Sequence, residues 1–491
     1  MTRQHRTAWV AIAVTAALAS CGGGSTGAVF IEGVASVDAV SDAWLDPDAS
    51  GAHLSDGHAD DATSLDTTAD FDAPIQVDTV SHVDLVLQAD SVSKPDSTGD
   101  AGQTDALAAL DAGPAATSFK VPPGVTTMVL GEFSHKQGDK VIGPLSVKIP
   151  ADAISFTLSF DGTHGITYGV DALQGPGGKK LVKTGWVNKS ENVGGQMCLS
   201  CKLRVTTMLS AAGALLPNAP DLSVAAGTYT FSVLALKRTL ITNYQPLAIS
   251  YPPGKVRVTV AIKHAVKSAA ATQGLPLVGA LDLNFYFTGS NGLTAASAPK
   301  HTAFLGWIAT LKTTYQQVGL SIGQVHYHDL DAGYQVIEGA VGFDKGDFEE
   351  VAALTKQSAW GVNLVFVREI ASPYGGAVLG ISGGAPGPVA VQGTGRSVVI
   401  VTTESNVGPG IVPDIGLVMA HELGHYLGLF HNSENNFGGF QPAIDDPLSD
   451  TPSNDNNNLM YFNGATKGAS LSAQQGVVMR GNPWVRHGGQ P

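Results

Sequence analysis

Five residues near the carboxyl end of the chain have the types and spacing of a metal centre that activates water. His421, Glu422, His425, Gly428 and His431 form the pattern H-E-x-x-H-x-x-G-x-x-H. Histidines four residues apart lie on one face of a helix, where two imidazoles can hold one Zn²⁺ at about 2.0–2.1 Å. Glycine adopts positive φ readily, so Gly428 can end the helix and bring the third histidine to the metal. Three protein ligands leave one position open for water, and the neighbouring glutamate can act as its general base.

The residues before this pattern favour a helix. Residues 411–420 form a largely apolar run in which Pro413 suits a helix start and Asp414 suits the positive end of the helix dipole. The alternative is an amphipathic helix whose histidines are ordinary core or surface groups. The apolar run and the five fixed positions favour the metal centre over that alternative.

Three further segments accompany the motif. Residues 458–461 read N-L-M-Y, residues 450–452 read D-T-P, and residues 471–480 contain L-S-A-Q-Q followed by V-M-R. With the motif, they resemble the metzincin clan of zinc endopeptidases, and within it the pappalysin-like family. The resemblance extends from about residue 275 to the C-terminus.

The resemblance implies an α/β proteolytic domain that hydrolyses protein or peptide substrates. It implies that His421, His425 and His431 are zinc ligands, that Glu422 is the general base, and that Met460 is the Met-turn residue. It also implies that the Gly- and Pro-rich residues 380–395 border the cleft, with an edge strand that pairs with an extended peptide.

Two positions depart from the pattern of the clan and family. The clan often has a tyrosine two residues after the Met-turn methionine, whereas this chain has Phe462 there and Tyr461 one residue earlier. Pappalysin-like domains commonly carry cysteines after the zinc motif, and this chain has none after Cys201.

Oxygen-bearing side chains cluster between the motif and the predicted Met-turn. Asp445, Asp446, Asp450 and Thr451 lie in this segment, and hard oxygen ligands at this density suit Ca²⁺. The resemblance also implies calcium near this loop. A polar, turn-rich loop without an ion is the alternative, and both interpretations stay open.

The first residues of the chain have the pattern of an export signal. Arg3, His5 and Arg6 precede an apolar run at residues 8–18, which is too short for a stable membrane span. The tetrad L-A-S-C ending at Cys21 resembles the lipobox of bacterial lipoproteins. We therefore expect export, lipidation of Cys21 and anchoring to a bacterial cell envelope, at the outer membrane or cell surface. The alternative is an ordinary secretory signal with an incidental cysteine.

Charge and cysteine content limit the possible functions. Residues 22–118 contain 17 Asp, Glu32 and Lys94, a net charge of −17, so the acidic character belongs to one segment that reads as a disordered spacer. Nucleic-acid binding is therefore not expected, and we expect a monomer.

Cys198 and Cys201 predict a local disulfide in an exported chain.

The remaining sequence divides into two folded parts. Short β-like runs separated by Gly and Pro predict an antiparallel β-sandwich, and strands alternating with helices follow it. Expected elements of the second part are strands near 281–287, 324–328, 363–367 and 397–401, a helix near 302–318, and the helix of the motif. The predicted organisation is a signal peptide (1–20), a lipidated cysteine with an acidic linker (21–118), a β-sandwich-like domain (119–270) and a metzincin-like zinc protease domain with a mixed sheet (275–491).

Two rival functions remain compatible with this organisation. One is a surface adhesin or scaffold lipoprotein with a degenerate or latent protease domain, although Glu422 and the three histidines are all retained. The other is a zinc hydrolase acting on a non-peptide bond, which a cleft without an edge strand would favour.

Overall fold

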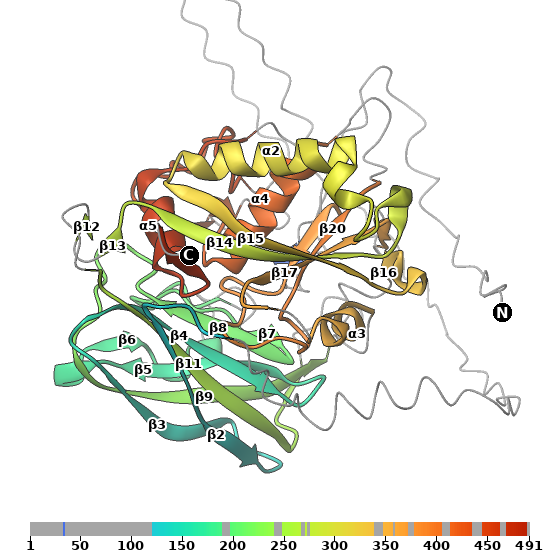
Figure 1. Ribbon diagram of the computed structural model, residues 1–491. Helices are drawn as coiled ribbons and strands as arrows, with labels where there is room; N and C mark the ends of the chain where they lie inside the picture. Colours follow the sequence, from blue (N-terminus) through green and yellow to red (C-terminus); the bar gives the residue numbers. More distant parts are fainter. Residues whose placement is uncertain are drawn as a thin grey trace, which may run out of the picture. The chain divides into compact units, whose positions relative to one another are not determined.

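The computed structural model describes most of the chain after residue 119 and one short strand before it (Figure 1). The described residues are 33–34, 120–188, 197–239, 248–266, 271–272, 275–337, 347–356, 359–371, 378–404, 413–434, 444–461 and 468–488. All of these described residues belong to one compact unit. Almost all of the predicted signal and acidic linker lie outside the described residues.

Two antiparallel sheets share one core in the first folded part, as expected for a β-sandwich. The first sheet has the strand order β2 (Val125–His135), β11 (Gly254–His264), β4 (Ala153–Gly162), β8 (Ala211–Leu216). The second has the order β10 (Ala248–Ser250), β9 (Gly227–Thr239), β5 (Thr167–Gln174), β6 (Lys180–Val182), with β3 (Val141–Ile149) on β9 and β7 (Met208–Leu209) on β5. Aromatic side chains from the two sheets meet between them: the Phe156 and Tyr229 rings lie 4.9 Å apart and the Phe160 and Phe231 rings 6.4 Å apart.

Strands β4 and β8 of the first sheet are buried on both faces. Strand β4 alternates apolar residues with Ser155, Thr157 and Ser159, and all three of these polar residues are buried. Ser159 shows the reason: its Oγ donates to the carbonyl of Val389 at 3.0 Å and accepts from the Val389 N–H at 2.8 Å. The polar face of β4 therefore packs on the second folded part instead of facing water.

A mixed sheet forms the second folded part. Its strand order is β1 (Gly33–Val34), β19 (Gly380–Ser382), β20 (Val399–Thr402), β17 (Val362–Val367), β14 (Gly279–Phe287), β15 (Leu320–Asp329), and β23 (Val485–His487) also pairs with β14. Strands β20, β17, β14 and β15 run parallel, whereas β19 is antiparallel to β20 and β23 to β14. The four strands expected from the sequence in this part are confirmed as β14, β15, β17 and β20. Three two-stranded pairs complete the sheets: β12 (Ala271–Thr272) with β13 (Leu275–Pro276), β16 (Val336–Ile337) with β18 (Glu369–Ile370), and β21 (Ser433–Glu434) with β22 (Ile444–Asp445).

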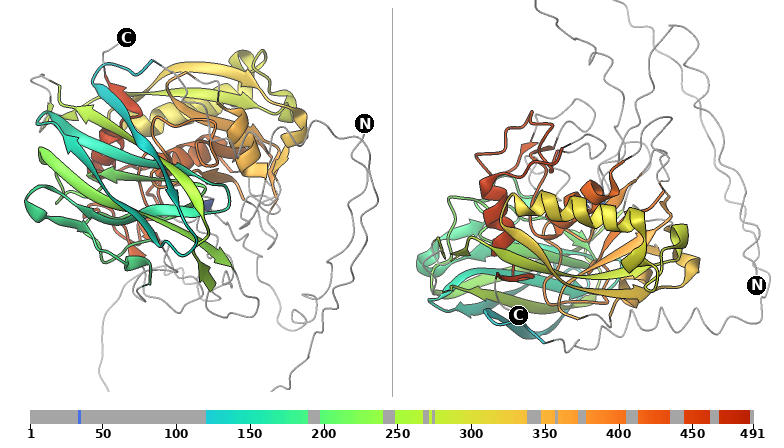
Figure 2. Two further views of the ribbon diagram at one scale, coloured as in Figure 1. Left: turned by 90° about the horizontal axis from the view of Figure 1, so that it is seen from below. Right: turned by 45° about the horizontal axis from the view of Figure 1, so that its top comes forward.

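Helices cover both faces of the mixed sheet. The helices are α2 (Thr302–Gln316), α3 (Asp347–Leu354), α4 (Ile415–Tyr426) and α5 (Ala473–Gly481). Helices α2 and α4 pack against each other on one face (Figure 2). There Phe304 of α2 contacts Phe285, Phe287 and Phe366, with ring centroids 5.3 to 5.5 Å apart. Because successive strand residues point to opposite faces, Tyr286 lies in the other core, with α3.

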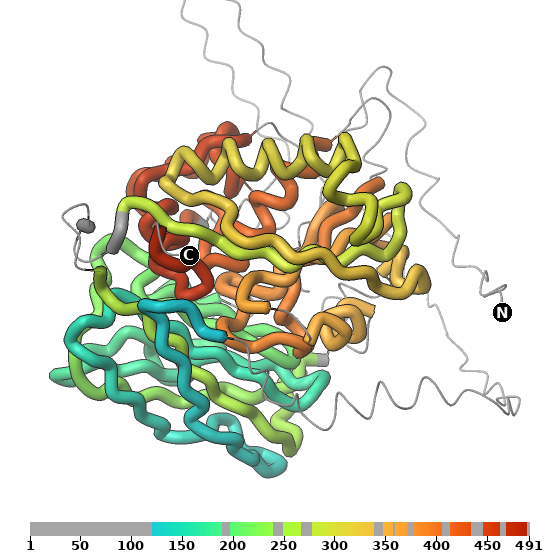
Figure 3. Tube along the Cα trace, in the orientation of Figure 1, coloured from blue at the N-terminus to red at the C-terminus, as the bar shows by residue number. Residues whose placement is uncertain are grey.

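The C-terminal segment joins the two folded parts. Figure 3 shows this segment, in red, beside strands of the first sheet. The buried ammonium of Lys263, on β11, donates hydrogen bonds to the backbone carbonyls of Arg480, Asn482 and Val485. Ser155 on β4 donates to the carbonyl of Gly481. An ammonium has three donors, so the three carbonyls can satisfy all of them away from water.

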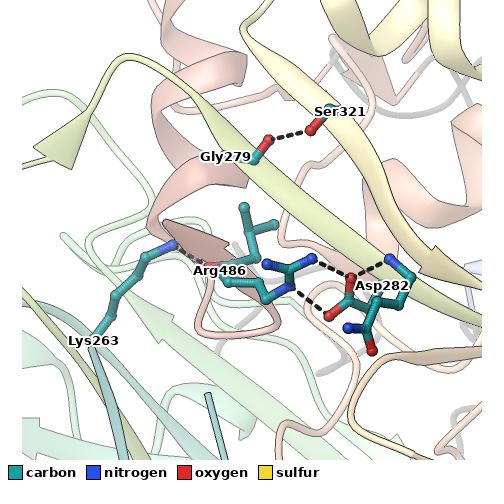
Figure 4. A network of polar contacts seen from close by, with 7 residues as sticks. Lys263, Gly279, Asp282, Ser321 and Arg486 are labelled. Carbon is teal, nitrogen blue, oxygen red and sulfur yellow. Dashed lines mark hydrogen bonds and ion pairs between the residues drawn. The ribbon is translucent and has the colours of Figure 1, made fainter. Parts of the chain in front are cut away.

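A buried ion pair fixes the same C-terminal segment to the mixed sheet (Figure 4). The Arg486 guanidinium donates from Nε to Asp282 Oδ2 at 2.6 Å and from Nη2 to Asp282 Oδ1 at 3.0 Å. The Gln324 N–H also donates to Asp282 Oδ1 at 2.6 Å. This two-point pairing links β23, β14 and β15, and removing one partner would leave an uncompensated buried charge.

The stability of this junction should depend on pH through Lys263. Burial lowers the pKa of Lys263 from 10.5 to about 7, and the Arg480 guanidinium acts in the same direction. A lowered folded-state pKa gives a stabilising contribution that is fully present above 10.5 and is lost as pH falls through about 7. The unfolding free energy of the wild type relative to Lys263→Met should therefore increase with pH across this window, by at most about 1.4 kcal/mol per pH unit.

Urea denaturation at several pH values measures this difference. Lys148→Met, which changes an exposed lysine on β3, is the matched control and should follow the wild type at every pH. Parallel pH profiles for wild type and Lys263→Met would contradict the assignment.

Candidate metal centre

Helix α4 carries the first part of the motif and has defined ends. The Asp414 carboxylate caps its start by accepting from the Gly416 N–H at 2.8 Å. The helix ends at Tyr426, and Gly428 has φ +110°, in the left-handed region that favours glycine. The expected helix and its glycine stop are both confirmed, and the chain then turns back toward the helix.

This turn brings the three histidines of the motif together. His421 Nε2 lies 3.0 Å from His425 Nε2, which lies 3.2 Å from His431 Nε2. The ligand nitrogens of all three lie within 4.8 Å of one another, and the residues are 2%, 0% and 5% exposed. The structure therefore brings the three predicted ligands together, and their nitrogens are close enough to share one small cation.

Backbone carbonyls orient two of these rings. The other ring nitrogen of His421 lies 2.6 Å from the carbonyl of Leu459, and that of His425 lies 2.9 Å from the carbonyl of Leu429. A carbonyl only accepts, so each Nδ1 carries the proton and each Nε2 presents its lone pair to the centre. Burial lowers the pKa of His425 well below its ordinary value of 6.5, and His421 and His431 act in the same direction. Neutral imidazoles with converging lone pairs are the donor set that a transition-metal ion requires.

Glu422 lies next to the first ligand and below the edge of the mixed sheet. Its side chain is 1% exposed. A Cβ added at Gly380, on β19, would lie 2.5 Å from Glu422 Cγ and 3.0 Å from Glu422 Oε1. Only a residue without a side chain therefore allows β19 and this carboxylate to lie so close, a role of Gly380 that the sequence did not indicate.

Met460 lies beneath the helix that bears the ligands. A Cβ at Gly424 would lie 2.7 Å from the Met460 sulfur, and Met460 is fully buried. The Met460 carbonyl accepts from the N–H of Asn432, the residue after the third ligand, at 2.9 Å. The predicted Met-turn segment thus contacts the motif at both ends. Tyr461 is described, whereas Phe462 lies outside the described residues.

Two of the residues predicted to bind calcium are engaged in a turn. Asp446 is 7% exposed, and its Oδ1 accepts from Thr451 Oγ1 at 2.6 Å and from the Leu448 N–H at 3.0 Å. Burial raises the pKa of Asp446 to about 7, a shift that the Thr451 hydrogen bond opposes. Within the described residues, Asp446 Oδ2 has no hydrogen-bond partner.

The other two predicted calcium residues also have protein partners. Asp450 accepts from Ser472 Oγ at 2.7 Å and from the Gln474 N–H at 3.0 Å, at the start of α5. The backbone carbonyl of Asp445 accepts from Arg204 at 2.6 Å. Calcium binding at this loop therefore stays a prediction.

Of the three cysteines, two lie in the described part of the chain and one lies outside it. The structure joins Cys198 and Cys201 by a disulfide, whereas Cys21 lies outside the described residues. Among the helices that the structure describes, none combines the length and the apolar character needed to cross a membrane.

Comparisons with known proteins find likeness among solved structures. No family model matches the chain, and no curated protein matches it. Among solved structures, the chain is similar to metalloproteinase-II from Bacteroides fragilis, with 14% sequence identity and a TM-score of 0.22. The similarity covers 45% of this chain and 62% of that chain, so less than two thirds of the length of that protein is spanned.

Loss of the central histidine should abolish metal binding. His425 contacts both other histidines, so His425→Ala should retain less than about a tenth of the bound divalent metal after dialysis, since each ligand contributes strongly to affinity. His326→Ala, which removes a partly exposed histidine on β15, should bind metal as the wild type does. Mass spectrometry of the metal measures the bound metal in both variants. Undiminished metal in His425→Ala would contradict the ligand assignment.

Proposed function

We propose that this chain is a zinc-dependent endopeptidase. The observation that carries the proposal is the convergence of three buried, carbonyl-oriented histidine nitrogens beside Glu422, at the edge of a sheet. Imidazole nitrogens suit zinc, and three protein ligands with a fourth position open are typical of catalytic rather than structural zinc sites. His421, His425 and His431 would hold the ion.

The residues of this chain would divide the reaction between binding and proton transfer. When bound, zinc supplies Lewis acidity that makes water acidic near neutral pH and polarises the scissile carbonyl. Glu422 accepts the proton that water loses as its oxygen attacks the carbonyl carbon. Glu422 then delivers that proton to the amine nitrogen as the carbon–nitrogen bond breaks. One water is consumed, and a carboxylic acid and an amine are produced.

The position of β19 supports a peptide substrate. Except for its pairing with β1, β19 is the outermost strand of the mixed sheet, and Gly380 places it directly against Glu422. Residues Gly33–Val34 pair with β19 along this edge, so the edge accepts an extended backbone. An extended substrate that takes the place of Gly33–Val34 can bind this edge by main-chain hydrogen bonds, which would lay its peptide bonds over the catalytic residues. A hydrolase of non-peptide bonds has no need for this strand.

We further propose that the protein acts outside the cytoplasm. The lipobox-like tetrad ending at Cys21 supports export and anchoring to a bacterial cell envelope. The disulfide between Cys198 and Cys201 supports an oxidising compartment. The acidic residues 22–118 would then space a monomeric protease from the membrane, with protein or peptide substrates as its partners.

Replacement of the general base should separate catalysis from metal binding. Glu422→Gln removes proton transfer but keeps the shape of the side chain, so kcat for an unfolded protein substrate should fall at least about 100-fold. Bound zinc should stay at the wild-type level. Glu369→Gln, at an exposed acid on β18, is the control, and mass spectrometry of the fragments is the measurement. Full activity in Glu422→Gln would exclude its role as the base, and loss of its zinc would make Glu422 a ligand instead.

A methyl group at Gly380 should displace the same carboxylate. Gly380→Ala puts a carbon where Glu422 Cγ would be only 2.5 Å away, so the base or the edge strand must move. We expect kcat to fall on the order of 100-fold, as for misplacements of about 1 Å, with zinc retained. Gly306→Ala, on the exposed side of α2 with no heavy atom within 4 Å of the added carbon, should stay fully active. Unchanged turnover of Gly380→Ala would show that β19 does not constrain Glu422.

A further inference from the structure

The segment that contains the disulfide is fixed to the core of the β-sandwich. The Cys198–Cys201 disulfide closes its first turn, and the Cys198 N–H donates to the carbonyl of Val205 at 2.9 Å. Cys198 is 0% and Val205 1% exposed. Asn218 donates from Nδ2 to the Arg204 carbonyl at 2.7 Å. The backbone of Arg204 is therefore held in place, and its side chain extends away from the sandwich.

The Arg204 side chain reaches the segment that carries the third histidine. Its guanidinium carbon lies 5.7 Å from the centre of the Phe430 ring, and its Nη1 donates to the carbonyl of Asp445 at 2.6 Å. Phe430 directly precedes His431, and Asp445 pairs with Ser433 in the β21–β22 ladder. One side chain of the sandwich thus contacts the chain on both sides of the third histidine.

A second contact between the β-sandwich and the turn after α4 lies just before the third histidine. A Cβ at Gly428 would lie 2.9 Å from Leu215 Cδ2, on strand β8 of the sandwich. Leu215 is 0% exposed and belongs to the core that also contains Leu429. The sandwich therefore packs against the path of residues 428–431 from the side of β8 as well as through Arg204.

This support matters because the three histidines are not positioned in the same way. His421 and His425 are one helical turn apart on α4, so the helix alone sets their spacing. His431 lies beyond the end of the helix, and its position depends on what the turn packs against. Residues that orient metal ligands without touching the metal commonly change metal affinity about 10- to 100-fold when they are replaced.

We propose that Arg204 is a positioning residue for His431, through which the disulfide-closed loop of the β-sandwich sets the affinity of the centre for zinc. This inference rests on the zinc site of the proposed function. It assigns the β-sandwich a part in building the metal centre.

Zinc affinity of the full-length chain, measured by competition with a chromogenic chelator, tests the proposal. Arg204→Ala should bind zinc at least about 10-fold more weakly than the wild type. Arg204→Lys keeps the charge and one donor and should recover part of this loss. Lys202→Ala, at an exposed position of the same loop, should bind zinc normally. The paired variant Cys198→Ser with Cys201→Ser should shift affinity in the same direction as Arg204→Ala, and normal zinc affinity there would remove the disulfide from the proposal.

A second readout separates positioning from general destabilisation. At saturating zinc, kcat of Arg204→Ala should return close to the wild-type value, because Glu422 and β19 are untouched. The melting temperature of the zinc-free protein should stay near that of the wild type. A kcat that stays low at saturating zinc, or a large drop in that melting temperature, would assign Arg204 a merely structural role.

The remaining outcomes also decide between the proposals. Wild-type zinc affinity in Arg204→Ala would overturn the positioning role. If that variant fails to fold, Phe430→Leu, which removes the ring under the guanidinium, must weaken zinc binding, and unchanged affinity would overturn the proposal. If the wild type binds zinc but cleaves no protein, only the endopeptidase function fails and the affinity data stand. If the wild type binds no zinc, both proposals fail.

Discussion

Three imidazole nitrogens within 4.8 Å of one another can face one point only if each ring is held with its lone pair inward. Such an arrangement is repulsive until a cation lies between the rings, so the surrounding structure must impose it. The carbonyls of Leu459 and Leu429 impose it on His421 and His425. The segment of the predicted Met-turn supplies the carbonyl of Leu459, and the turn after α4 supplies the carbonyl of Leu429.

Close packing on several sides of α4 explains why the two folded parts form one unit. Gly380 leaves room for Glu422, Gly424 for the sulfur of Met460, and Gly428 for Leu215 of strand β8. A sandwich that contributes Leu215 and the Lys263 junction to this unit is part of the centre's support. Its removal would expose the surface of the second part that packs on β4, including the Val389 backbone, and the turn that leads to His431.

The motif predicted the metal centre because the residues that form it lie close together in the sequence. The spacing of His421 and His425 follows from helix periodicity, and the stop at Gly428 follows from the backbone freedom of glycine. The role of Met460 is expected only from the family resemblance. The contact between Gly380 and Glu422 and that between Arg204 and Phe430 join residues 42 and 226 positions apart in the sequence, and no period or turn signal encodes such pairs. Ser159 and Lys263 illustrate the same limit. In the sequence they are polar residues of ordinary strands, yet both are buried at the junction between the two parts.

X-ray absorption at the zinc edge of the purified full-length protein tests the central claim most directly. We expect one zinc per chain, with three histidine nitrogens at about 2.0–2.1 Å and one water oxygen completing a four-coordinate shell. A shell containing sulfur, a shell closed by four protein ligands, or a chain that binds no zinc at all would contradict it.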